Sequence, residues 1–219
     1  MKLPSLMNSL RSLIDDVTAP YLWEDDELRA YINEAEREAA RRSRLILDKS
    51  TVSVTDISVV SGTSTYSLDS RVWGILRAKL DSEPRPLIKK PRQYFDSINN
   101  WESVTGTPIA YFRDRYTITL YPEPVAADTL SLDVIRLPLA DMDTADDEPE
   151  IPSHLHYQLI YWAAHLAFLK HDAETFDERA AMRNADLFAR HFGPPISANT
   201  EAAWQNHTQS HVSPLGATL

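Results

Sequence analysis

Residues 25–47 read DDELRAYINEAEREAARRSRLIL, the most regular helical pattern in the chain. Apolar side chains recur on one face at helical spacing: Leu28, Ile32, Ala35, Ala39 and Ile46. Acidic residues crowd the beginning of this stretch and arginines lie toward its end, which is the distribution that the helix dipole favours. We therefore expect a helix from about Asp25 to Leu47 that buries one apolar face.

Other helical patterns lie at both ends of the chain. A short one spans about Ser5 to Asp16, and two longer ones span about Ser153 to Lys170 and about Ala173 to Phe192. The apolar stripe of the third pattern is Leu155, Leu159, Trp162, Leu166 and Leu169. Because no single stripe can be buried alone, we expect the N-terminal and C-terminal helices to pack together.

The middle of the chain has the two-residue period of strands. Strand patterns cover residues 52–59, 66–68, 72–80, 109–113, 116–121 and 130–134, and a short helix is expected near residues 91–101. The predicted fold class is α+β: a helical bundle from the N- and C-terminal helices, an inserted antiparallel β-rich domain and an extended C-terminal tail. The N-terminal helices of the bundle are expected over residues 1–49 and the inserted β-rich domain over 50–140. An acidic linker over 141–151, the C-terminal helices of the bundle over 152–192 and the extended tail over 193–219 are expected to follow.

Two of these segments are polar. Residues 141–151 hold a run of acidic side chains without a basic one, which is typical of a solvated, flexible linker. Residues 193–219 are too polar to form a core of their own. Their few apolar residues are candidate contacts to a portal protein or to a neighbouring copy: Ile196, Trp204, Val212 and Leu215. The alternative is that this tail folds back on its own chain.

Composition bounds the possible functions. The 219 residues include no cysteine, which excludes disulfides, zinc–thiolate sites and a cysteine nucleophile. The formal net charge of −10 opposes binding to nucleic acid phosphates. No apolar run approaches the roughly 20 residues that cross a bilayer, and no signal-peptide pattern is seen. We expect a protein without membrane partners that is made in a cytoplasm-like compartment.

Catalytic and metal-binding motifs are scarce. The five glycines form no phosphate-binding loop, and neither H-E-x-x-H nor G-x-S-x-G occurs. His154, His156 and His165 are the best metal candidates, but alternate residues of a helix point to different sides, so exposed histidines on a helix flank are the favoured interpretation. The acidic run lacks the order and the central glycine of a calcium loop. We expect no enzyme activity, metal or cofactor.

Two further groups have a functional and a structural interpretation. Arg37, Arg41 and Arg44 share a helix face and could meet phosphates, but nearby glutamates favour salt bridges, and we expect contacts between subunits there. Four aromatic residues could stack on bases or sugars, but in a β-rich segment sheet and core positions are favoured: Trp73, Tyr111, Tyr116 and Tyr121.

Several motifs, in order, resemble those of phage head-to-tail adaptor (connector) proteins. They are Trp23-x-Asp25-x-Glu27-Leu28 followed by Tyr31-Ile32-Asn33-x-Ala35, Gly62-x-x-x-Tyr66-x-Leu68, Trp101, Gly106-x-Pro108-x-x-Tyr111, Ile118-x-Leu120-x-Pro122-x-Pro124, and Glu150-Ile151-Pro152 with His156, Tyr161, Ala163 and Ala164. The resemblance covers about residues 20–190, and the polar tail lies outside it.

This resemblance implies a structural virion protein at the head–tail interface, assembled in the host cytoplasm as a ring of about twelve copies. The implied partners are other copies of the chain, the portal protein and tail or nozzle proteins, with DNA passing through the channel without specific binding. The alternatives are another phage tail-completion or terminator protein, a metal-dependent hydrolase that uses His154, His156 and the acidic run, and a DNA-binding regulator that uses the arginines of residues 25–47.

Overall fold

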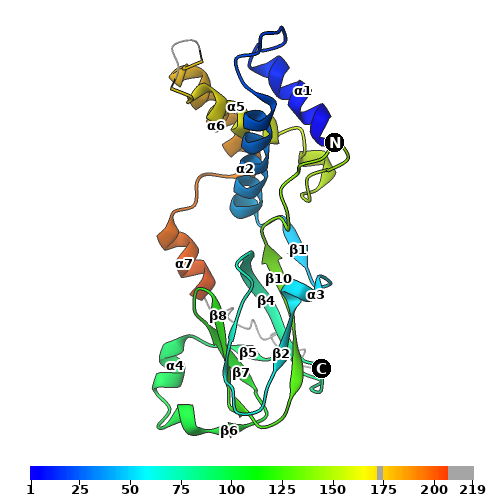
Figure 1. The fold of residues 1–219 in the computed structure, drawn as a ribbon. Coiled ribbons are helices and arrows are strands. Elements are labelled where there is room, and N and C mark those ends of the chain that lie inside the picture. The colour runs from blue at the N-terminus through cyan, green and yellow to red at the C-terminus, as the bar shows by residue number, and fades with distance from the viewer. Residues whose placement is uncertain (172–174, 207–219) are drawn as a thin grey trace, which may run out of the picture. The chain divides into compact units, whose positions relative to one another are not determined.

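The computed structural model describes residues 1–171 and 175–206, with the side chains of 204–206 left out, and it divides into two compact units (Figure 1). The first consists of Met1–Asp48 and Ile135–Ile196. The second consists of Lys49–Val134 together with the C-terminal residues from Ser197 onward. The chain therefore leaves the first unit after Asp48 and returns to it at Ile135.

The first unit is a helical bundle built from both ends of its chain. Its helices are α1 (Leu3–Leu13), α2 (Asp25–Ser43), α5 (Leu159–Phe168) and α6 (Glu178–Phe192), with a 3₁₀ turn, η2 (Ser153–Leu155), before α5. One core contains fully buried side chains from each helix, among them Leu6, Leu10, Leu28, Ile32, Leu159, Ile160 and Phe188. The predicted packing of N-terminal against C-terminal helices is confirmed.

The long helix α2 begins where the sequence predicts and ends earlier. At its start, the backbone N–H of Glu24 donates to the Glu27 carboxylate at 3.1 Å. At its end, Arg44 adopts a left-handed conformation with φ of 54°, and Ile46–Asp48 then form strand β1. The expectation of a helix to Leu47 was wrong because Ile46 continues the helical spacing of the apolar face. Ile46 is buried all the same, from a strand.

The loop between α1 and α2 is held by buried charges. Arg11 donates to Asp16 at 2.5 Å and to Asp25 at 2.6 Å, and its guanidinium lies 3.9 Å from the centre of the Tyr21 ring. The indole Nε1 of Trp23 donates to the carbonyl of Ala167 at 3.2 Å, which ties the loop to α5. The beginning of α2 is thereby fixed against the rest of the bundle.

The acidic segment 141–151 does not behave as the expected flexible linker. Its acidic side chains are exposed except for the half-buried Asp147, but Met142 and Ile151 are buried in the helical core. Arg37 pairs with Asp141, and Arg29 pairs with Asp143 at 3.0 Å. The run of like charges suggested solvation correctly for the side chains, while the backbone lies along α2, whose arginines and asparagine bind it.

The second unit contains mainly antiparallel sheets. Strand β10 (Asp128–Arg136), whose last two residues belong to the first unit, pairs with β2 (Asp56–Val59) and β4 (Val72–Leu80). A second sheet has the order β3-β8-β7-β5, from Thr65–Ser67, Thr117–Tyr121, Ala110–Arg113 and Ile88–Lys89. Thr105–Gly106 (β6) pairs with Glu123–Pro124 (β9). The β5–β7 and β6–β9 pairs are parallel, unlike the antiparallel arrangement expected throughout.

Short elements differ most from the sequence-based expectation. Val52–Thr55 form a helical turn, α3, instead of a strand. The helix expected over residues 91–101 is divided into α4 (Arg92–Asp96) and the 3₁₀ turn η1 (Trp101–Ser103). The helix expected from Ala173 begins at Glu178, where the Asp177 carboxylate accepts from the N–H of Ala180 at 3.0 Å. For Val52–Thr55, the two-residue alternation of valines is compatible with a strand and with a helical turn, so contacts with flanking residues determine which of the two forms.

The expected extended tail contains a helix. Ala198–Asn206 form α7, which groups with the second unit and contacts β4. This part of the tail folds back on its own chain, which was the alternative to an extended path. The polar composition did not exclude a helix, because the run of Ala, Asn, Glu and Gln contains several good helix formers. Residues 207–219, with Val212 and Leu215, lie outside the described residues.

Candidate binding pocket of the β-rich unit

An aromatic cluster builds one wall of a pocket in the second unit. Phe95 of α4 is fully buried, and the centres of its ring and the Phe112 ring of β7 are 5.2 Å apart. Tyr121 of β8 and Trp101 of η1 contact the same phenylalanine at 5.5 and 5.9 Å. The ring of Trp101 also meets Phe112 edge-on at 5.8 Å and 79°. Because four rings fix one another, the half-buried Trp101 presents a rigid face to the pocket.

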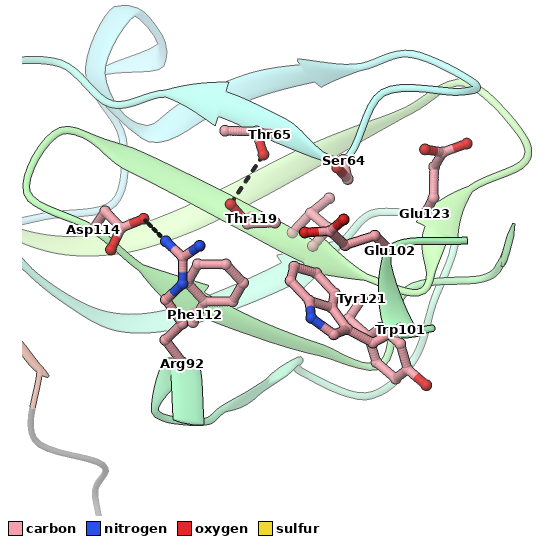
Figure 2. Close-up of a pocket in the computed structure, with 11 residues that line it drawn as sticks. Ser64, Thr65, Arg92, Trp101, Glu102, Phe112, Asp114, Thr119, Tyr121 and Glu123 are labelled. Atoms are coloured by element: carbon pink, nitrogen blue, oxygen red, sulfur yellow. Dashed lines mark hydrogen bonds and ion pairs between the residues drawn. The ribbon is translucent and has the colours of Figure 1, made fainter. Parts of the chain in front are cut away.

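Polar groups surround this wall, as Figure 2 shows. The Arg92 guanidinium lies 5.6 Å from the centre of the Phe112 ring and 3.6 Å from the Asp114 carboxylate. Thr119 is paired with Phe112 across β7 and β8, and its hydroxyl shares a hydrogen bond of 3.0 Å with the Thr65 hydroxyl of β3. The Arg92–Asp114 pair is exposed, so it is easily screened and rearranged.

Two glutamates complete the pocket, which has a volume of about 290 Å³. Glu102 projects from η1, and Glu123 projects from β9. In the described part of the chain, neither carboxylate takes part in a hydrogen bond or an ion pair. The pocket therefore combines an aromatic wall with acidic groups that lack a counter-ion.

Pocket residues were not found from the sequence as a site. Trp101 belongs to the motifs that resemble the adaptor family, while Glu102 and Glu123 lie in segments without a chemical motif. Thr119 and Tyr121, two residues apart on β8, both line the pocket. The only sequence signal for this pocket was Trp101 next to Glu102, shortly before Gly106 and Pro108, and a signal of this kind is weak by itself.

The apolar residues expected to contact partners are spread over the tail. Ile196 is half-buried at the end of the first unit. Trp204 lies in α7, and Val212 and Leu215 are outside the described residues. Ile196 does not line the pocket.

The three arginines expected at subunit contacts lie on or just after α2. Arg37 pairs with Glu34 at 3.0 Å as well as with Asp141, and Arg41 pairs with Glu38 at 2.8 Å. Arg44 follows the helix, and burial lowers the pKa of its guanidinium. The glutamates that the sequence suggested as partners therefore do pair with Arg37 and Arg41 within one chain.

The histidines do not form a metal site in the described residues, where no group of three possible ligands gathers. His154 is exposed, whereas His156 is buried and its Nε2 donates to the carbonyl of Ile151 at 2.8 Å. His165 Nδ1 lies 2.9 Å from the carbonyl of Ala181. The expectation of exposed histidines was wrong for His156, because the buried segment at Ile151 supplies it with a polar partner.

Aromatic residues singled out in the sheet are mostly structural. Tyr111 and Trp73 are buried, and burial raises the pKa of the Tyr111 hydroxyl to about 12. Tyr116 is exposed at the β7–β8 turn, and Tyr121 lines the pocket. Arg113 is buried and donates to the carbonyls of Val72 and Trp73.

The chain consists of a helical bundle and an inserted β-rich unit, and no catalytic constellation was found in the described ranges. The chain belongs to the SU10 adaptor protein family, whose sequence profile matches residues 1–211. It is thus a phage structural adaptor, which is not a class of enzyme. A search of curated proteins found no match to the chain. Within the described ranges, no helix is long and apolar enough to span a membrane.

Proposed function

We propose that the chain forms a ring beneath the portal, connects the portal to the tail and lets DNA pass through its channel. The observation that carries this proposal is the family match over residues 1–211, which includes both units and α7. Ring formation requires two different surfaces of each copy to meet, so that identical chains follow one another until the ring closes.

Exposed apolar side chains on the α1–α2 loop support a contact surface on the helical unit. Val17, Tyr21 and Leu22 are 60%, 48% and 41% exposed. The loop is not free to fold them inward, because Arg11 and Trp23 fix it by the buried contacts described above. Fixed apolar groups at a surface are suited to bury area against a partner without a large loss of conformational entropy.

The net charge supports passage of DNA without adhesion. The formal charge of the chain is −10, and a channel wall of the same sign repels the phosphate backbone. In the C-terminal tail, the residues proposed to contact the portal or a neighbouring copy are Ile196, Trp204, Val212 and Leu215. Arg37, Arg41 and Arg44 are proposed to exchange ion-pair partners at the interface between copies.

The mass of the assembled particle tests the ring. Native mass spectrometry of the purified chain, alone and with the portal protein, is expected to give a closed ring of about twelve copies and a complex of ring and portal. A chain that stays monomeric in both samples contradicts the proposal. A sixfold ring favours the alternative function, that of a tail-completion or tail-tube terminator protein.

Truncation tests the tail separately. One variant lacks residues 207–219 and keeps α7, while a second lacks residues 194–219. The variant that lacks residues 207–219 is expected to keep its circular dichroism spectrum and its melting temperature but to lose binding to the portal or to a neighbouring copy. Normal assembly of both truncated chains shows that the tail is not the contact.

A further inference from the structure

The pocket of the second unit has an excess of negative charge. Its lining holds one guanidinium, on Arg92, and three carboxylates, on Glu102, Asp114 and Glu123. Arg92 already pairs with Asp114, and the two glutamates lack a partner within the described residues. Figure 2 draws the glutamates with Trp101 on one side and the Arg92–Asp114 pair on the other.

The aromatic wall adds attraction for a cation. Tryptophan is the side chain with the strongest electrostatic attraction for cations over its face. Trp101 lies beside Glu102 in the sequence, on the same 3₁₀ turn, and Phe95 and Phe112 hold its ring in place. An aromatic face and a carboxylate are therefore offered to one ligand from a single rigid element.

We propose that this pocket takes an arginine side chain presented by a neighbouring protein in the assembled particle. A planar guanidinium can stack on an indole and donate two hydrogen bonds to a carboxylate at the same time, which a lysine ammonium cannot. The volume of about 290 Å³ is at the lower limit of small-molecule sites and fits a single long side chain. That the arginine belongs to a neighbouring protein rests on the proposed adaptor function.

Two other ligand classes fit the pocket less well. An anion is repelled by the negative charges of the three carboxylates that line the pocket. A saccharide stacks on aromatic rings and accepts hydrogen bonds, but it brings no positive charge to Glu102, which is exposed, or to Glu123, which is half-buried. Arginine is the ligand that satisfies both the charge and the aromatic face.

A titration of the full chain labelled with ¹⁵N-tryptophan tests the ligand class. The probes are N-acetyl-arginine amide and its neutral isostere N-acetyl-citrulline amide, and a Trp101→Phe variant assigns the Trp101 signal among the five tryptophans. We expect the arginine probe to shift the Trp101 indole signal with a dissociation constant of about 1 mM. No shift, or an equal shift with citrulline or with a neutral saccharide, overturns the proposal.

Charge-removing variants test the two glutamates. Glu102→Gln and Glu123→Gln are each expected to weaken arginine binding by about tenfold. Asp96→Asn is the matched control, because Asp96 is exposed on α4, outside the pocket lining, and its substitution removes the same charge. Unchanged binding in both glutamate variants, or equal weakening in Asp96→Asn, overturns the assignment.

The particle assay separates this proposal from the adaptor proposal. The probe titration uses the isolated chain and succeeds or fails whatever the ring number is. In assembly, the double variant Glu102→Gln/Glu123→Gln is expected to raise the dissociation constant for its partner by about tenfold or more. Rings and portal complexes that form with unchanged affinity in this variant overturn the neighbour as the source of the arginine and leave the adaptor proposal intact.

Discussion

Asn33 and Met142 exchange two hydrogen bonds across 109 residues of chain. The Asn33 amide Nδ2 donates to the Met142 carbonyl at 3.0 Å, and its Oδ1 accepts from the Met142 N–H at 2.9 Å. Both residues are buried, at 6% and 3% exposed. A side-chain amide from the middle of α2 thus takes the place of a strand partner for the acidic segment.

Replacing Asn33 by alanine is expected to lower the free energy of unfolding by about 3 kcal/mol, because a buried N–H and a buried carbonyl of Met142 lose their partner. Urea denaturation followed by tryptophan fluorescence measures the change. Asn8→Ala, on the exposed side of α1, is the control. A loss as small in Asn33→Ala as in Asn8→Ala means that water replaces both bonds and that the amide does not hold the segment.

Glu36, one turn further along α2, is expected to make stability depend on pH. The carboxylate is 2% exposed and accepts from the N–H of Glu150 at 2.5 Å. Burial raises the pKa of Glu36 to about 7, opposed by backbone hydrogen bonds and reinforced by the charge of Glu150. The folded state therefore binds this proton more tightly than the unfolded state does. The stability from this group is complete below about pH 4.5 and is lost as pH rises through 7.

Glu36→Gln removes this dependence. Relative to the unmodified chain, the variant is expected to gain up to about 3 kcal/mol of unfolding free energy at pH 8 compared with pH 4.5. Urea titrations at both pH values measure this difference, and Glu34→Gln, partly exposed on the same helix, is the control. If the two variants show the same pH dependence, Glu36 is ionised in the folded protein at no cost.

Leu159→Ala tests whether the bundle depends on the meeting of the two chain ends. Leu159 begins α5 and is fully buried in the shared core. Its truncation is expected to cost about 3 kcal/mol, from lost transfer free energy and the cavity left behind. Leu47→Ala, at a position 67% exposed, should change stability by less than about 0.5 kcal/mol. Thermal and urea unfolding give both values, and equal effects contradict the described core.

Weak binding of DNA is expected from the isolated chain. A protein of formal charge −10 gains little from counter-ion release, so the dissociation constant for duplex DNA should lie above about 1 μM at about 150 mM salt. Fluorescence anisotropy with a labelled duplex measures it over a salt series. Submicromolar affinity at that salt concentration favours the alternative of a DNA-binding regulator.

The elements with long, uninterrupted patterns were predictable. The start of α2 at Asp25 and both bounds of β4, Val72–Leu80, agree with the sequence pattern. The hairpin of β7 and β8 does so within a residue at each end. In each case local spacing and tertiary burial favour the same conformation.

The remaining features depend on contacts between distant residues. The residues near Arg44 in the sequence do not predict its left-handed conformation. Likewise, the residues near Met142 do not predict that an asparagine of α2 binds its backbone. The pocket unites η1, β8 and β9, whose residues carry no shared motif. A site of this kind follows from strand pairing and cannot be read from local patterns.

Asp48 and Arg136 stand where the chain leaves the helical unit and where it has returned to it, and their side chains pair at 2.6 Å while both are buried. Entry and exit of the β-rich insertion therefore lie at one place. In evolutionary terms, two neighbouring chain positions are all that recombination must join in order to exchange the inserted module for another.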